Sequence, residues 1–232
     1  MRGESVSQRL ILAALTVAGG GLTIASVRMG QSWSGVWLNV GTGLVGSVIT
    51  YLLFEQLLGA RERQRDRRDA LGRDLRGNDV AIRNFALEEM VARGWLVGAD
   101  LRNCNLDGAA LRGHDLTEAD LTGASLFGAD LSGARLRRAV IRLANLQGAQ
   151  LIGSDLEEAD LERADCRGAL LTDASLRGAT LSSALLNGVD ATGADLRGVR
   201  ADGAVWEGAQ VRGAQHDSVT LDDLRRAGAV VG

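Results

Sequence analysis

The sequence lacks several residue types on which common protein classes depend. Proline and lysine are absent from the 232 residues, and only 3% of the residues are aromatic. An ordinary enzyme or sandwich core draws much of its buried area from large aromatic side chains, so such a core is not expected here. Apolar residues nevertheless make up 46% of the chain, which excludes disorder throughout.

Cysteine and histidine are also scarce. The two cysteines, Cys104 and Cys166, are too few for a disulfide scaffold, and their positions in the repeat described below place them too far apart to bond. The two histidines, His114 and His216, leave little material for histidine-based catalysis or for a metal centre. No phosphate-binding loop, dinucleotide motif or metal-ligand cluster occurs. We therefore expect a protein that is not an enzyme, with no catalytic residue, metal ion or cofactor.

Two uncharged stretches near the N-terminus are long enough to cross a membrane as helices. They cover residues 10–27 and 33–54, and a spanning helix needs about 20 mostly apolar residues. Two tryptophans lie near one end of the second stretch and Tyr51 lies near the other, where interfacial aromatic residues are typical. We therefore predict a transmembrane helical hairpin in residues 1–54. A cleaved signal peptide is the alternative for the first stretch.

An arginine-rich helical stalk is expected over residues 55–77. Because arginine is concentrated after the second stretch, the positive-inside rule places both termini and the rest of the chain in the cytoplasm. The exclusive use of arginine is typical of a GC-rich bacterial genome, so the membrane is predicted to be a bacterial inner membrane. The stalk is either a solvated extension or a surface that contacts anionic lipid headgroups. The candidate lipid-contacting residues are Arg61, Arg63, Arg65, Arg67 and Arg68.

A short helix should follow the stalk within residues 78–98. Asn78 or Asp79 is a suitable N-cap, and Gly94 is suited to end the helix. Its apolar residues recur at spacings of three and four on one face, which must be buried against another part of the molecule. These residues are Ile82, Phe85, Ala86 and Met90. We expect this helix to cap the N-terminal end of the domain that follows.

Residues 99–223 repeat with a period of five. The register runs through 25 consecutive pentapeptides without an insertion, with Ala most often first, Leu third and Gly fifth. A period of five fits neither an α-helix nor a β-strand. It fits a coil of square cross-section with one pentapeptide per side, in which the first and third residues point inward. Stacked coils would then pair their backbones at about 4.8 Å, as in other β-solenoids.

The charges test this geometry within the sequence itself. If four pentapeptides complete one coil, residue i lies beside residue i+20. Charges of opposite sign recur at that spacing, as in Asp115, Arg135 and Asp155, and a pair of opposite charges on neighbouring strands contributes about 0.2–1 kcal/mol. There are three other examples: Glu118 with Arg138 and Glu158; Arg137 with Glu157 and Arg177; and Arg142 with Glu162.

The repeat resembles that of the pentapeptide-repeat family, whose pattern is A-(D/N)-L-x-x. The resemblance covers residues 99–223 and implies an all-β fold, a right-handed quadrilateral β-helix of about six coils. Because the ends of a solenoid expose backbone, each end needs a cap. We expect residues 224–232 to form the C-terminal cap. Some members of the family mimic DNA and protect or inhibit DNA gyrase.

The function expected from these features is that of a membrane-anchored scaffold or adaptor that binds a protein partner at the cytoplasmic face. Outward apolar residues are few, and Phe127, Ile152 and Leu170 are the candidate interaction surface. Membrane lipid and further copies of the chain are the other expected partners. Because the basic residues lie in the stalk and in paired ladders, direct nucleic-acid binding is not expected. A DNA mimic acting on gyrase and a structural or lipid-organising membrane protein are the alternatives.

Overall fold

The computed structural model describes residues 33–217, 224, 226 and 228–230, and it describes side chains from residue 46 onward. The first predicted membrane span, at residues 10–27, lies outside these residues. The second lies on helix α2, Trp33–Leu75, which is 43 residues long. In the part of the chain that the structure describes, no helix is both long enough and apolar enough to span a membrane, so the predicted hairpin is not supported.

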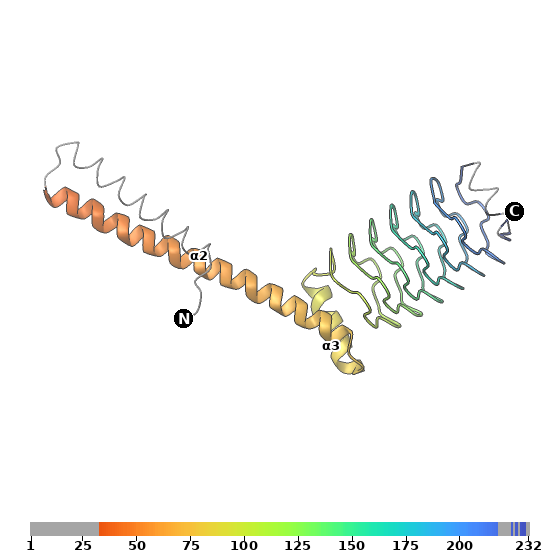
Figure 1. Ribbon diagram of the computed structural model, residues 1–232, viewed down its shortest axis with the longest axis horizontal. Coiled ribbons are helices and arrows are strands. Elements are labelled where there is room, and N and C mark those ends of the chain that lie inside the picture. The colour runs from red at the N-terminus through yellow and green to blue at the C-terminus, as the bar shows by residue number, and fades with distance from the viewer. Residues whose placement is uncertain (1–32, 218–223, 225, 227, 231–232) are drawn as a thin grey trace. The chain divides into compact units, whose positions relative to one another are not determined.

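The chain divides into two units, residues 1–66 and 67–232. The second unit contains the last turns of α2, helix α3 (Val80–Ala92) and the stacked coils that Figure 1 shows in green to blue. Asp79 is the N-cap of α3, and its carboxylate accepts the N–H groups of Ala81 at 2.9 Å and Ile82 at 3.1 Å. The predicted helix and its N-cap are therefore confirmed.

The predicted burial of the apolar face of α3 is wrong in its first half. Ala86 and Met90 are buried, but Ile82 is 49% exposed and Phe85 is 59% exposed. The end of the solenoid is narrow, because its interior holds two inward residues from each side, so only part of α3 packs against it. The surplus apolar residues of α3 remain exposed in the described unit.

The end of α2 also belongs to the cap, where the sequence indicated a solvated stalk. Leu71 and Leu75 are fully buried, and the carbonyl of Leu75 accepts the N–H of Asn105 in the first coil at 3.0 Å. Arg76 donates from Nε to the carbonyl of Arg102 at 2.7 Å. The last turn of α2 therefore binds the exposed backbone edge of the first coil, which a charged, solvated stalk would leave unpaired.

The coils have the predicted length of four pentapeptides. Parallel β-bridges join residues 20 apart, beginning with Asp100 and Asp120 and continuing to Asp195 and Gln215. Each bridge involves a single residue per side, so the described residues contain no longer strand. The molecule is therefore a four-sided β-helix built from isolated bridges between turns.

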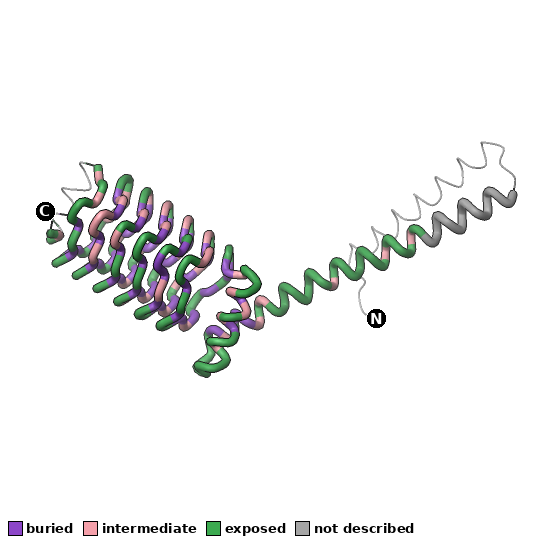
Figure 2. The backbone as a smooth tube through the Cα atoms, turned by 180° about the vertical axis from the view of Figure 1, so that it is seen from behind, coloured by how far each residue is buried: buried purple, intermediate pink, exposed green. Residues whose placement is uncertain are grey.

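The pentapeptide pattern follows from the geometry of one side. The first and third residues point inward, where Ala129 and Leu131 are fully buried, and exposed residues alternate with these along each coil (Figure 2). The third residue then begins a β-turn. In one such turn, the N–H of Ala109 donates to the carbonyl of Leu106 at 3.0 Å. The fifth residue has a positive φ, which is +65° at Gly108. This requirement explains why glycine is frequent there.

The C-terminal residues extend the last coil. Leu224 is buried, and its carbonyl accepts the N–H of Ala229 at 3.0 Å, with Gly228 between them at φ +86°. This is the longer hydrogen bond of a Schellman motif. Val230 then forms a parallel bridge with Gln210, so the register of 20 residues continues to the described end of the chain.

Candidate interaction surface

The solenoid presents four sides, which we number by their first pentapeptides. The first side begins at Ala99, the second at Cys104, the third at Ala109 and the fourth at His114. On each side, the second, fourth and fifth residues of successive pentapeptides form three outward columns. These columns decide what each side can bind.

The fourth side carries charge pairs between its first three coils. Arg138 lies between Glu118 and Glu158, at N–O distances of 3.9 Å and 2.8 Å. Arg135 lies 3.6 Å from Asp115, and Arg137 forms an ion pair with Glu157. These predicted pairs are confirmed, as is that of Arg142 with Glu162 on the first side. Two predicted pairs, Arg135 with Asp155 and Glu157 with Arg177, do not form in the described coils.

Aspartate in the second position is a turn residue, as its regular outward column in the sequence indicates, and its carboxylate has a specific role there. Its Oδ1 accepts the N–H of the residue two places on, as Asp190 does from Thr192 at 3.0 Å. The Thr192 side chain and amide together lower the pKa of Asp190. When the fourth residue is arginine, the same carboxylate also holds its guanidinium, as Asp165 holds Arg167 at 2.7 Å. The D/N preference of the repeat was the available signal, since both side chains supply this acceptor.

The second side has no side chain in its fifth-residue column. Its fifth residue is glycine in every coil, and a Cβ added at any of these glycines would meet no atom within 4 Å. Phe127 projects from this side and is 55% exposed. Leu185 and Val205 form a bridge pair there and are 37% and 38% exposed, an apolar pair that their spacing of 20 residues would have revealed. The glycines are Gly108, Gly128, Gly148, Gly168, Gly188 and Gly208.

The third side holds the other two candidate surface residues. Ile152 is 40% exposed and Leu170 is 37% exposed, and they belong to successive coils. The structure therefore brings Ile152 and Leu170 to one side, whereas Phe127 lies on the adjacent second side. Together these two sides carry most of the exposed large apolar residues of the described coils.

The five candidate lipid-contacting arginines fall into two groups. Arg61, Arg63 and Arg65 are exposed on α2. Arg67 forms an ion pair with Glu89 of α3, and Arg68 donates to the carbonyl of Val97 at 2.8 Å. Arg67 and Arg68 therefore hold the cap together, because each links α2 to the chain that leads into the first coil.

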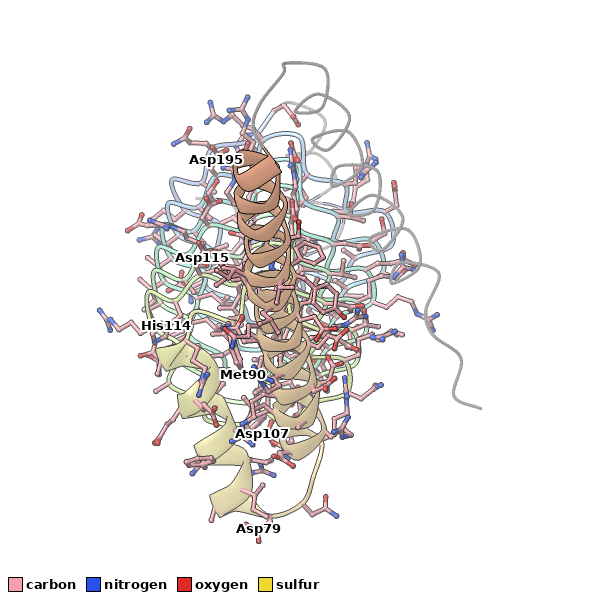
Figure 3. The ribbon with its side chains drawn as sticks, turned by 90° about the vertical axis from the view of Figure 1, so that its left-hand side faces the viewer. Asp79, Met90, Asp107, His114, Asp115 and Asp195 are labelled. Carbon is pink, nitrogen blue, oxygen red and sulfur yellow. The ribbon has the colours of Figure 1, made fainter. Side chains whose placement is uncertain are left out.

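The cysteines and histidines occupy structural positions. Cys104 and Cys166 are free and buried, and burial raises the pKa of their thiols to about 11 and about 12. His114 and His216 are half-buried at opposite ends of the solenoid, and Figure 3 labels His114 at the N-terminal end. The described residues contain no cluster of His, Cys, Asp or Glu that could hold a metal ion.

These features define a tandem-repeat solenoid with a helical N-terminal cap. Residues 94–123, 119–157 and 164–200 match the family of pentapeptide repeats, in eight copies. The chain belongs to the pentapeptide-repeat family. No curated protein matches the sequence.

Several solved structures are similar to the chain. The pentapeptide repeat protein Rfr23 from the cyanobacterium Cyanothece 51142 is 30% identical, with a TM-score of 0.31, over 45% of this chain and 60% of that one. The chain thus spans 60% of the length of Rfr23. The pentapeptide repeat protein alr5209 from Nostoc Pcc 7120 is 30% identical over 63% of this chain and 93% of that one, with a TM-score of 0.31. QnrB1, a plasmid-mediated fluoroquinolone resistance protein, is 17% identical over 59% of this chain and 93% of that one, with a TM-score of 0.31.

Proposed function

We propose that this pentapeptide-repeat protein is a scaffold that binds a protein partner along the second and third sides of its solenoid. The observation that carries the proposal is the contrast between sides. The first three coils of the fourth side are joined by ion pairs, whereas the second and third sides expose Phe127, Ile152 and Leu170, and the second side also carries a column of glycines. Exposed apolar side chains on a flat surface favour protein binding over catalysis.

The same contrast disfavours the alternative of a DNA mimic. Such a mimic needs a broad field of one sign. On the fourth side, Arg138 stands between two glutamates and Arg137 pairs with Glu157, so the charges cancel locally. The observed ion pairs therefore support a protein-binding role rather than imitation of a polyanion.

We further propose that α2 attaches the scaffold to the cytoplasmic face of a bacterial inner membrane. Support comes from the apolar side chains of residues 48–58, which are 41–63% exposed on the helix. A helix that is apolar on all sides needs an apolar environment, and a lipid bilayer provides one. The exposed Arg61, Arg63 and Arg65 follow directly, where anionic headgroups would attract them. The apolar side chains are Val48, Ile49, Leu52, Leu53, Phe54, Leu57 and Leu58.

The test is purification of the intact protein from its own membranes after mild crosslinking, followed by mass spectrometry. We expect a stoichiometric protein partner that is lost when Phe127, Ile152 and Leu170 are all changed to Asp. Leu143→Asp is the matched control, because Leu143 is also 55% exposed but lies on the first side. A partner retained by the triple variant would overturn the proposed surface, and recovery of gyrase subunits would favour the DNA mimic.

The membrane attachment is tested in the same preparations. The intact chain should be recovered with the membrane fraction, and changing Leu52, Leu53 and Leu57 to Glu should move it to the soluble fraction. Recovery of the intact chain in the soluble fraction would contradict the attachment without affecting the proposed surface.

A further inference from the structure

The first coil differs from the others at its backbone. Inside the solenoid, the second residue of each side donates its N–H to the preceding coil and accepts an N–H from it. Asp130, for example, donates to the carbonyl of Ala109 at 2.9 Å and accepts from Leu111 at 2.8 Å. The first coil has no preceding coil, so its edge needs other partners.

The cap supplies these partners on three sides. On the first side, Arg76 binds the carbonyls of Arg102 and Asp100. On the second side, the carbonyl of Leu75 accepts from Asn105, and on the fourth side the carbonyl of Thr117 accepts from Gly98 at 2.8 Å. Each of these sides therefore has at least one bond between the edge and the cap.

The third side of the first coil is left open. Within the described residues, neither the N–H nor the carbonyl of Ala110 has a hydrogen-bond partner. Ala109 beside it is 9% exposed, whereas its counterparts Ala129 and Ala149 in the following coils are fully buried. An edge of this kind is a template for a further strand.

A groove runs along this edge. It has a volume of about 310 Å³ and lies between α3 and residues 105–110 of the first coil. The apolar side chains of Leu87, Val91 and Leu106 line it. Arg83, Glu88 and Asp107 line it as well, so charges of both signs are present. Figure 3 shows α3 at this end of the solenoid, with Met90 and Asp107 labelled.

We propose that this groove binds an extended peptide segment of a partner protein, which adds to the third side of the first coil as a parallel strand. The backbone of the peptide pairs with the N–H and carbonyl of Ala110, and an apolar side chain enters between α3 and Leu106. This is strand addition beside a helix, in which the main chain provides affinity and the pocket provides selectivity. A helical partner would not pair with the N–H and carbonyl of Ala110, because the backbone groups of a helix are already hydrogen-bonded to one another.

The cap argues against a second copy as the occupant. It is bonded to the first, second and fourth sides of the first coil through Arg76, Leu75 and Gly98. The four-sided end of another solenoid would therefore meet the cap, whereas a single extended segment needs only the third side. Since the groove carries both signs of charge, peptide binding should also depend little on salt.

The test uses the full-length protein and a phage-displayed library of unstructured 12-residue peptides. The strongest binder is synthesised with a fluorophore, and its Kd is measured by fluorescence anisotropy. Ala110→Pro removes the N–H without removing an internal hydrogen bond, and we expect it to weaken binding at least tenfold. Ala110→Ser keeps the N–H and is the matched control, for which the Kd should stay within about twofold.

A second pair of variants tests the apolar part of the groove. Val91→Glu should abolish binding, whereas Phe85→Glu on the exposed face of the same helix should leave the Kd unchanged. Thermal unfolding followed by circular dichroism confirms that each variant is folded. Failure to select any peptide would overturn the proposal, as would a peptide whose Kd is the same for Ala110→Pro and Ala110→Ser. The outer sides of the coils are not involved, so the partner surface at Phe127, Ile152 and Leu170 is tested separately.

Discussion

At the scale of single residues, each position of the pentapeptide meets a different physical demand. Ala and Leu fill the interior, the fifth residue adopts positive φ, and Asp or Asn at the second position closes the turn through its side-chain oxygen. Asp190 shows the last of these, because it binds the N–H of Thr192 and its pKa is lowered as a result. Side chains that look like a column of catalytic carboxylates therefore hold turns in place.

Asp190→Ala should destabilise the solenoid, because the N–H of Thr192 loses its acceptor. We expect a loss of about 1 kcal/mol in the free energy of unfolding, measured by urea denaturation at pH 7. Asp190→Asn retains an oxygen acceptor, so its free energy of unfolding should be close to that of the unchanged protein. An equal loss in both variants would show that charge, rather than the turn hydrogen bond, determines the contribution of Asp190.

The joint contribution of these carboxylates to stability should be seen when the pH is lowered. The pKa values of Asp115, Asp130 and Asp190 are lowered in the folded protein, chiefly by hydrogen bonds from Thr and Ser side chains two residues on. Their contribution to stability is complete above the unfolded pKa of about 4 and is lost as pH falls through the lower folded values. The melting temperature should therefore change little between pH 7 and pH 5 and fall below pH 4. A constant melting temperature down to pH 2.5 would contradict this assignment.

At the scale of elements, the caps show what the repeat pattern leaves undetermined. The period of five gave the four-sided coil and its turn length, and the N-cap and apolar spacing gave α3. The role of Leu71 and Leu75 was not predictable, because they lie in an arginine-rich helix whose partner is reached only after the chain reverses. The open third side was likewise hidden, since it depends on which backbone groups the cap leaves unpaired.

Met90→Ala should weaken the N-terminal cap. Met90 is buried in the core that α3 shares with the first coil, and truncation of a buried methionine to alanine costs about 2–5 kcal/mol. Phe85→Ala, on the exposed part of the same helix, should change stability by less than about 0.5 kcal/mol. Hydrogen exchange of the first coil provides the measurement, with faster exchange expected for Met90→Ala. Equal exchange in the two variants would show that α3 does not protect the coil.

At the scale of the whole molecule, the register of 20 residues is the property on which all sides depend. Insertion of one residue after Gly148 moves the inward Ala and Leu of every later pentapeptide to outward positions, so it should prevent cooperative folding. Insertion of a complete coil of 20 residues at the same place keeps every pairing and should be tolerated. Circular dichroism and thermal unfolding distinguish the two. A one-residue insertion with an unchanged melting temperature would contradict the coil register.

The bridges between residues 20 apart also determine how the protein folds during its synthesis. Every contact between coils joins segments that are close in sequence, so the contact order is low and loop closure costs little entropy. Since α2 and α3 precede the coils, the N-terminal cap is synthesised before the surface that it protects. Each coil can then dock on the one before it as it leaves the ribosome, without waiting for the C-terminus.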